Sequence, residues 1–348
     1  MHVLKHAQEL NGHVHVAVDL ACAQAAAGHH VVFASGPGAF DDLLQAHGVQ
    51  VERVTEATGK RAAARSMWDL LRVARRERPD VVHAHMMSSA VLSYPIAKLT
   101  GALLVTTVHN SFEPHSSLMR LGDVVVAVSA AERKSLVERG FSARKTMAVL
   151  NGADGSPREE LPKGDFDSLA TPCIMTLSGL HPRKAVDDVV RAFALVQPEF
   201  PQWHLNVVGW GPDRAKLMRL TEELGVESSV HFVGATLAPR HLLDRADVLA
   251  SGSLAEPFGL NIAEARAAGC AVVATNVGGI PEVLDQGRAG LLVPPSDPPA
   301  MAAAFRQLLE DPQTLARWRA KAAAGSERFT VQRMADDYEQ VYRTALAR

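Results

Sequence analysis

The stretch Ala250–Leu284 reads ASGSLAEPFGLNIAEARAAGCAVVATNVGGIPEVL, and it decides how the rest of the chain is interpreted. It opens at the end of an apolar run, Ala246–Ala250, which is typical of a buried strand. Small polar residues then lead through a loop that contains Glu256, and a helical pattern begins at Leu260 and stops at Gly269. An apolar run follows, so the order strand, loop, helix, strand predicts part of a parallel α/β sheet.

The junction between a strand end and the next helix is where open parallel sheets bind ligands. The helix N-terminus there presents free backbone N–H groups and a partial positive charge to an anion. Glu256 falls in the predicted loop and Glu264 in the first turns of the helix. Because a carboxylate beside a phosphate is repelled, we expect both glutamates to accept hydrogen bonds from hydroxyl groups instead. The stretch therefore predicts a site for a phosphate flanked by hydroxylated groups, as in a sugar nucleotide.

Four short motifs follow one another in this region. They are E-P-F-G-L from Glu256 with Glu264 after it, A-G-C-A-V-V-A from Ala268, G-G-I-P-E from Gly278 and G-L-L-V from Gly290. The series resembles the E-x7-E signature region of the retaining glycosyltransferases of family 4. That resemblance implies the GT-B fold, which consists of two Rossmann-like, doubly wound α/β domains facing across a cleft.

The resemblance extends over nearly the whole chain and is strongest from Cys173 to Val293, and a length of 348 residues suits two domains. The expected division is residues 1–154 for an N-terminal Rossmann-like domain on the acceptor side, 155–170 for a linker, 171–328 for a C-terminal Rossmann-like domain that binds the nucleotide sugar, and 329–348 for a helix that returns to the first domain. The linker contains Asp165-Phe166-Asp167, which matches a D-x-D metal motif but is interpreted as a solvated acidic turn.

Composition excludes several classes of function. Lys and Arg number 36 against 38 Asp and Glu, so no basic field favours nucleic acid. Cys22, Cys173 and Cys270 are odd in number and lie in apolar surroundings, which indicates buried thiols in a reducing compartment. No apolar run approaches the roughly twenty residues of a membrane span, and no secretion signal is evident. We therefore expect a cytoplasmic protein, either free or peripheral at the inner face of the membrane.

The resemblance also implies roles for individual residues. Glu256, His109 and Lys184 would be the catalytic residues. Glu256 would accept from hydroxyls of the sugar, Lys184 would hold the donor diphosphate, and His109 would reach the donor sugar or its phosphate. Glu264 would accept from the ribose. The other implied donor-binding positions are Gly12, Arg183, Gly234, Phe258, Gly259 and Leu260.

The chain departs from the family pattern at three places. The family arginine falls on Gly179, and the glycine after the lysine falls on Ala185. Arg183 could supply the missing cation if its side chain points the same way as that of Lys184. Gly12 stands alone where the family usually has a pair of glycines after the first strand.

A metal site is the alternative interpretation of His83 and His85, which point to the same face of a predicted strand. No acidic or cysteine ligand accompanies them, so we predict no metal there. The resemblance likewise implies a reaction that requires no metal and no other cofactor.

The function expected from the sequence is that of a retaining glycosyltransferase of the hexosyltransferase type. It would move a sugar from a nucleoside-diphosphate sugar to a hydroxyl of a carbohydrate, lipid-linked or small-molecule acceptor, in cell-surface polysaccharide or glycolipid synthesis. Two alternatives remain open. One is a sugar-nucleotide epimerase or a phosphorylase on the same fold, and the other is a non-catalytic sugar-nucleotide-binding protein, which the departure at Gly179 favours.

The segment Lys60–Arg78 bears on the acceptor. It combines many basic residues with Trp68 at helical spacing and resembles a basic amphipathic surface helix. Such a helix suits peripheral contact with a membrane that carries a lipid-linked acceptor. A solvated helix face is equally compatible with the pattern.

Overall fold

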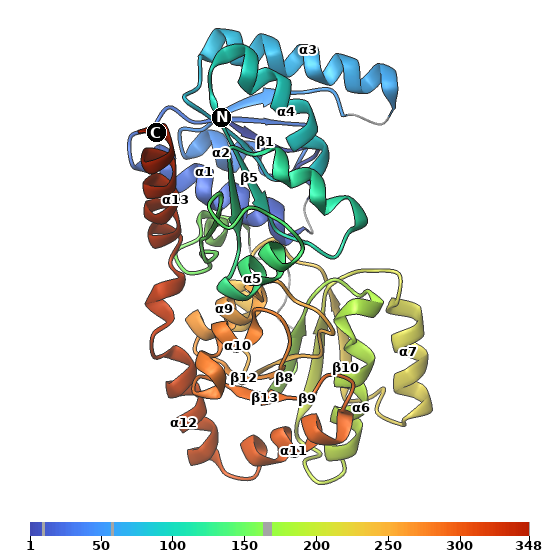
Figure 1. Cartoon of the computed structure of the whole chain (residues 1–348). Helices are drawn as coiled ribbons and strands as arrows, with labels where there is room; N and C mark the ends of the chain where they lie inside the picture. Colours follow the sequence, from blue (N-terminus) through green and yellow to red (C-terminus); the bar gives the residue numbers. More distant parts are fainter. Residues whose placement is uncertain (9–10, 57–58, 163–168, 348) are drawn as a thin grey trace. The chain divides into compact units, whose positions relative to one another are not determined.

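The computed structural model describes residues 1–8, 11–56, 59–162 and 169–347. These residues form two compact units, of which the first comprises Met1–Pro157 with Thr330–Arg348 and the second comprises Arg158–Phe329 (Figure 1). Each unit is built on a parallel β-sheet with helices, as the strand, loop, helix pattern predicts. The Asp165-Phe166-Asp167 tract lies outside the described residues.

The first unit contains a seven-stranded sheet in the order β3-β2-β1-β4-β5-β6-β7. Its strands are β1 (His2–Val3), β2 (Val32–Ser35), β3 (Gln50–Arg53), β4 (Val81–Ala84), β5 (Leu103–Val108), β6 (Val124–Ala127) and β7 (Thr146–Ala148). The order reverses between β1 and β4, where His2 pairs with His83 in register. Such a reversal opens a crevice at the carboxyl ends of the strands.

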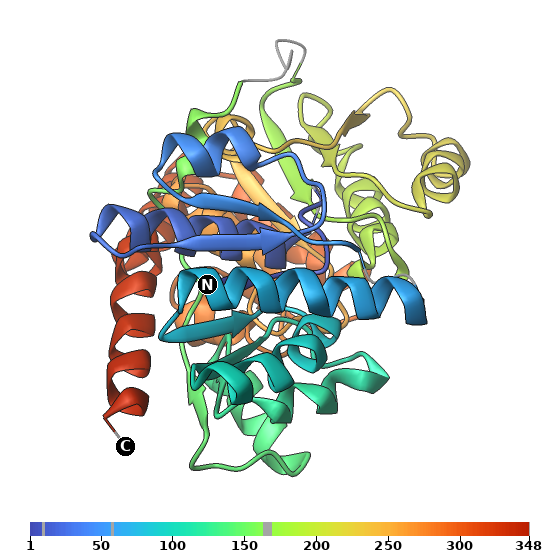
Figure 2. The same ribbon diagram turned by 90° about the horizontal axis from the view of Figure 1, so that it is seen from above.

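The helices of the first unit are α1 (Gly12–Ala26), α2 (Asp41–Ala46), α3 (Lys60–Glu77), α4 (Met87–Thr100), α5 (Ala130–Glu138) and α13 (Val331–Leu346), with the 3₁₀ helix η1 (Pro114–Leu121). Figure 2 shows α3 as a long helix of this unit, and its buried residues Leu70 and Ala74 join the core cluster around Val82. The C-terminal helix α13 runs beside α1 (Figure 1). Helix α13 is also fixed by a hydrogen bond between the hydroxyls of Tyr338 and Thr107, at 2.9 Å.

The second unit contains a six-stranded sheet in the order β10-β9-β8-β11-β12-β13. Its strands are β8 (Cys173–Leu177), β9 (His204–Val208), β10 (Val230–Gly234), β11 (Val248–Ser251), β12 (Ala271–Thr275) and β13 (Leu291–Val293). Its helices are α6 (Val186–Val196), α7 (Arg214–Glu223), α8 (Arg240–Leu243), α9 (Leu260–Ala267), α10 (Ile280–Val283), α11 (Pro298–Leu309) and α12 (Pro312–Ala323), with the 3₁₀ turns η3 (Pro182–Lys184), η4 (Asp285–Gly287) and η5 (Ser326–Phe329). A further turn, η2 (Pro157–Glu160), spans the boundary of the two units.

The core of the second unit follows from helical spacing. In α6, the side chains of Val186, Val189, Val190, Phe193 and Val196 recur at intervals of three and four residues and are all buried. They pack with α11 in one apolar cluster over the sheet. In the described part of the chain, no helix is both long enough and apolar enough to cross a membrane.

Candidate active site

The signature stretch forms the predicted strand, loop, helix and strand. Strands β11 and β12 lie side by side, and the loop between β11 and helix α9 carries Glu256. Gly259 precedes the helix with a φ of +102°, a left-handed conformation that glycine adopts without steric cost. At the start of α9, N–H of Ile262 donates to the carbonyl of Gly259 at 3.0 Å, and a helix N-terminus presents its first backbone N–H groups to an anion.

Two glycines of the signature hold this loop in place. A Cβ on Gly278 would lie 2.0 Å from the carbonyl oxygen of Glu256, and one on Gly279 would lie 2.3 Å from that of Pro257. The backbone N–H of Gly279 donates to the Glu256 carbonyl at 2.8 Å. The G-G pair is therefore required because the two backbones touch, and that contact fixes the position of Glu256.

Phe258 turns its side chain into the core, so only its backbone is available to a ligand. Its side chain is buried and packs edge-on against Phe329, with ring centroids 5.9 Å apart. The aromatic ring thus anchors the loop to the core, while Gly259 and Leu260 carry the chain into the helix. The sequence placed these residues near the ligand, and the structure places their backbone at the helix start.

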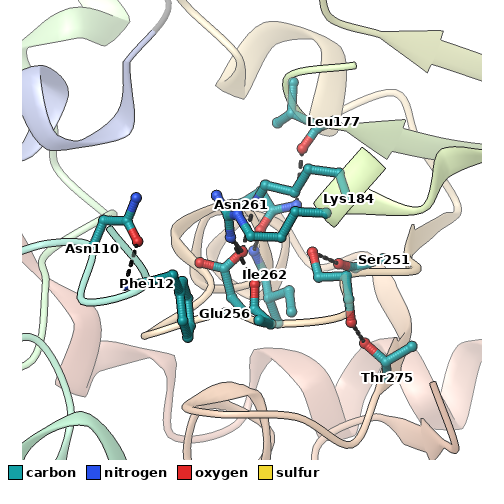
Figure 3. A network of polar contacts seen from close by, with 12 residues as sticks. Asn110, Phe112, Leu177, Lys184, Ser251, Glu256, Asn261, Ile262 and Thr275 are labelled. Atoms are coloured by element: carbon teal, nitrogen blue, oxygen red, sulfur yellow. Dashed lines mark hydrogen bonds and ion pairs between the residues drawn. The ribbon is translucent and has the colours of Figure 1, made fainter. Parts of the chain in front are cut away.

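Lys184 and Glu256 come together in the second unit, as Figure 3 shows. Nζ of Lys184 donates to Oε2 of Glu256 in a direct ion pair between two mostly buried side chains. The turn η3 that carries Lys184 is tied to the loop after β11, because N–H of Leu254 donates to the Arg183 carbonyl at 2.8 Å. Strands β8 and β11, which precede these loops, are neighbours at the reversal of strand order, where open sheets bind ligands.

Arg183 points toward the same carboxylate as Lys184, which answers a question that the sequence left open. Its Nη1 donates to the carbonyl of Ala255 at 2.7 Å and lies 4.0 Å from Oε2 of Glu256. Two cations therefore converge on one acidic residue. An anionic ligand could draw on both cations.

Two of the three departures from the family pattern, at Ala185 and Gly179, have different structural consequences. Ala185 has a φ of 42° and ψ of 48°, the left-handed region that costs a residue with a Cβ about 1 kcal/mol, so glycine suits this position better. Gly179 lies under the imidazole of His181, since a Cβ there would be 2.9 Å from its Cδ2. A larger side chain at position 179 would have to displace that ring.

Glu264 is buried in α9 at 8% exposure, and its Oε1 accepts a hydrogen bond from Nη2 of Arg158 at 3.1 Å. Arg158 is itself 2% exposed. No local pattern in the sequence singles out Arg158, which lies in a stretch without apolar periodicity. A buried guanidinium needs an acidic or carbonyl partner, and Glu264 supplies one. The start of α9 is further fixed by Asn261, whose Nδ2 donates to the Leu177 carbonyl at 2.9 Å (Figure 3).

Gly234 ends strand β10 with a φ of +92°. Its carbonyl accepts from N–H of Gly209 at 2.7 Å. The structure therefore shows Gly234 as part of a backbone turn at the carboxyl edge of the second sheet.

Two of the predicted residues, His109 and Gly12, belong to the first unit. His109 directly follows β5 and is half-buried, and Gly12 is the first residue of α1. The ring centroid of His13 lies 6.0 Å from that of His109, so both helix start and strand end meet at the carboxyl edge of the sheet. Burial lowers the pKa of His109 well below its usual value and that of His13 to about 4.

His83 and His85 are joined by His2, which the sequence analysis did not single out. One nitrogen from each ring lies within 4.8 Å of the others. The pairing of β1 with β4 brings His2 beside them. The cluster could therefore be predicted from the sequence only if these two strands were known to be neighbours. His2 forms hydrogen bonds with Gln24 at 2.8 Å and with His85 at 3.0 Å. His83 forms hydrogen bonds with the hydroxyls of Thr107 and Tyr342, at 2.7 Å each. His85 also forms a hydrogen bond with His109 at 3.1 Å.

Comparison with known proteins identifies the family. The family described as Glycosyl transferases group 1 matches residues 159–324, and Glycosyltransferase Family 4 matches residues 10–156. The N-acetyl-alpha-D-glucosaminyl L-malate synthase of Bacillus anthracis is 31% identical over 291 residues, covering 78% of this chain and 76% of that protein. A glycogen synthase of Mycobacterium tuberculosis is 30% identical, covering 78% of this chain and 68% of that protein.

Solved structures show the same fold. The structure of Anabaena HepE in complex with UDP and glucose superposes with a TM-score of 0.82 at 22% identity, covering 97% of this chain and 98% of that one. The sucrose-phosphate synthase of Thermosynechococcus elongatus superposes with a TM-score of 0.77 at 22% identity, covering 98% and 95%. The parallel sheets of both units agree with these GT-B structures. The chain belongs to the group 1 glycosyltransferases and is an enzyme of the hexosyltransferase type.

Proposed function

We propose that this enzyme moves a sugar from a nucleoside-diphosphate sugar to an acceptor hydroxyl with retention of the anomeric configuration. The observation that carries the proposal is the convergence of Lys184, Arg183 and Glu256 in the second unit, in the loops beside the start of α9. Two cations and a helix N-terminus suit a diphosphate, and the carboxylate suits the hydroxyls of the attached sugar. Glu264 in α9 would accept from the ribose.

The chemistry follows from these positions. As the bond from sugar to phosphate breaks, negative charge grows on the diphosphate, and Lys184 with the backbone N–H groups near Gly259 stabilises it. Arg183 adds a second positive charge. Because these groups meet the leaving charge, the reaction needs no metal ion, and the leaving phosphate can take the acceptor proton on the same face of the sugar. No carboxylate has to act as a nucleophile.

The expected result with radiolabelled donor is transfer of label to an added acceptor, with the configuration of the product established by NMR spectroscopy. A thermal-shift screen of nucleoside diphosphates first selects the base. A ligand present at a hundred times its dissociation constant stabilises the folded state by about 2.7 kcal/mol, which such a screen detects. Uridine diphosphate is the first candidate, since HepE was solved with UDP.

The alternatives predict different products in this assay. An epimerase would convert the donor sugar without an acceptor. A phosphorylase would release a sugar phosphate and would need a lysine-bound pyridoxal phosphate. A binding protein would bind the nucleotide sugar without turnover. Any of these three outcomes, or an inverted product, would contradict retaining transfer.

We further propose that the enzyme works in the cytoplasm at the inner face of a membrane, in polysaccharide or glycolipid synthesis. All three cysteines are buried, which suits a reducing compartment. Helix α3 supports the membrane contact. Its buried face includes Leu70 and Val73, and the opposite face exposes side chains at intervals of three and four residues, namely Arg61, Arg65, Trp68, Arg72 and Arg75. Trp68 is 64% exposed in the middle of this basic stripe.

Cosedimentation with vesicles tests this contact. The protein should bind vesicles containing phosphatidylserine at low salt, since each basic residue near an anionic surface contributes about 1 kcal/mol. Moderate salt should weaken binding. The double variant Arg65→Glu/Arg72→Glu should abolish it, whereas Lys145→Glu/Arg219→Glu, with the same change in net charge at exposed positions elsewhere, should not. Absence of binding by the unaltered protein at low salt would exclude the contact.

A further inference from the structure

A chain of hydrogen-bonded side chains crosses the first unit from helix α1 to the end of strand β5. Nε2 of His2 lies 2.8 Å from Oε1 of Gln24, and Nδ1 of the same ring lies 3.0 Å from Nε2 of His85. Nδ1 of His85 in turn lies 3.1 Å from Nε2 of His109. The first three residues are buried and His109 is half-buried, so the chain leads from the core to the carboxyl edge of the sheet.

The three rings are neutral at physiological pH because burial opposes charge. Burial lowers the pKa of His2 to about 3 and holds the pKa of His85 and His109 well below the usual value. A neutral imidazole carries a proton on one nitrogen and a lone pair on the other. Each ring in the chain therefore donates on one side and accepts on the other. If the donor and acceptor roles are fixed at one end of the chain of rings, the roles at the other end follow.

Gln24 fixes the donor and acceptor roles along the chain of rings, because a side-chain amide has one donor group and one acceptor group. Its Oε1 faces His2, while its Nε2 lies 3.5 Å from the hydroxyl of Tyr342. An amide oxygen can only accept, so His2 donates from Nε2 and accepts at Nδ1. His85 then donates from Nε2 and accepts at Nδ1. His109 likewise donates from Nε2, which leaves its Nδ1 without a proton.

We propose that Gln24, His2 and His85 are positioning residues that hold His109 in its Nε2–H tautomer, so that its Nδ1 lone pair accepts a hydrogen bond from a hydroxyl of the donor sugar. This proposal rests on the proposed function and on the family resemblance, which implies that His109 reaches the donor sugar. The tautomer decides which part of the donor His109 contacts. A lone pair suits a sugar hydroxyl, whereas a phosphate would require an N–H.

A second observation at the same edge also indicates a polar ligand. Within the described residues, Nε2 of His13 is buried without a hydrogen-bond partner, and its ring lies beside that of His109. A buried nitrogen without a partner is costly, and a ligand that reaches this edge would relieve the cost.

The alternative for these rings is a metal shared by His2, His83 and His85. Both nitrogens of His83 already contact hydroxyls, of Thr107 and Tyr342, at 2.7 Å each. Its ring also lies against that of His85, with centroids 4.0 Å apart and 33° between the planes. No lone pair of His83 is therefore left to point at a common metal position.

NMR spectroscopy of protein labelled with ¹⁵N-histidine reads the tautomer directly. His109 is assigned by the signals that disappear in His109→Gln, and we expect its Nε2 to carry the proton. Gln24→Glu presents only acceptor oxygens to His2, so the same tautomer should persist. Gln24→Leu removes the acceptor, and the two tautomers should mix. Gln24 lines a cavity of about 200 Å³, which leaves space for either side chain.

Kinetics separate positioning from a structural role. For Gln24→Leu, we expect kcat/KM for the sugar nucleotide to fall by about tenfold or more, the scale of one lost hydrogen bond. The dissociation constant of the free nucleoside diphosphate should stay within about twofold, because that product lacks the sugar. Gln24→Glu should restore activity, and Gln45→Leu, at an exposed glutamine of α2, should leave both quantities unchanged.

Failure of the proposed positioning of His109 can be distinguished from failure of the proposed enzyme activity. Three results would overturn the proposed positioning of His109 even in an active transferase. They are a His109 proton on Nδ1, a tautomer that does not respond to Gln24→Leu, and a switch to the Nδ1–H tautomer in Gln24→Glu. One equivalent of zinc retained per chain after dialysis would also overturn it. Absence of transfer from every nucleotide sugar would instead contradict the proposed function, while the NMR result would still decide the tautomer.

Discussion

Replacing Lys184 by alanine is expected to lower kcat by about a hundredfold or more, the scale of losing one oxyanion donor. The reason is that Lys184 meets charge that grows on the leaving diphosphate. Glu256→Ala should lower kcat by a comparable factor, because Glu256 positions the sugar while its bond to phosphate breaks. Steady-state kinetics with the donor identified by the screen measures both effects.

Binding of the free nucleoside diphosphate distinguishes the two variants. Lys184→Ala should weaken it, because the ammonium contacts the phosphates. Glu256→Ala should leave it nearly intact or tighten it, because the product has no sugar and the carboxylate that pairs with Lys184 is gone. The control is Lys216→Ala, which removes an exposed lysine 3.2 Å from Asp187 and should change neither quantity.

Glu264 should behave differently from both. If it holds the ribose in the ground state and the transition state alike, Glu264→Gln should mainly raise the donor KM. Glutamine keeps an acceptor for the buried Arg158, which is why it is preferred to alanine. Loss of nucleoside-diphosphate binding in Glu256→Ala, together with unchanged binding and turnover in Lys184→Ala, would refute this placement of the donor.

Acid should destabilise the first unit through its buried histidines. Their folded-state pKa values lie below the value near 6.5 of an exposed histidine, so the unfolded chain binds more protons at low pH. Stability is therefore complete above about pH 6.5 and is lost as the pH falls toward the folded pKa, which for His2 is about 3. At pH 5 the loss from His2 alone is about 2 kcal/mol, and His83 and His85 add to it in the same direction.

Urea unfolding between pH 7.5 and pH 5, followed by circular dichroism, measures this dependence. The variant His2→Phe should lose less stability over that range than the unaltered protein, since one titrating group is gone. Phe33→Leu, a substitution in the ring that stacks on His2, should lower stability equally at every pH. A free energy of unfolding that did not change between pH 7.5 and pH 5 would contradict the assignment of neutral, buried rings.

The sequence by itself determined the fold class and the local arrangement of the signature stretch. Alternation of apolar runs with helical patterns predicted parallel α/β architecture, and both sheets are parallel. The loop and helix around Glu256 and Glu264 were predictable because their cause is local, in the form of glycines at the turns, a helix start at Leu260 and a helix stop at Gly269. The roles assigned to these residues stay predictions until the variants are measured.

Only the tertiary structure decided which side chains meet. The sequence left the direction of Arg183 open, and the structure turns it toward the carboxylate that Lys184 contacts. It also shows that Arg158 contacts Glu264, and that Gln24 and His2 are hydrogen-bonded in series to His85, directly after β4. Spacing along the chain cannot give such contacts, because they depend on which strands are neighbours and on how their side chains pack. A buried polar side chain takes its partner from whatever the fold brings within hydrogen-bonding distance.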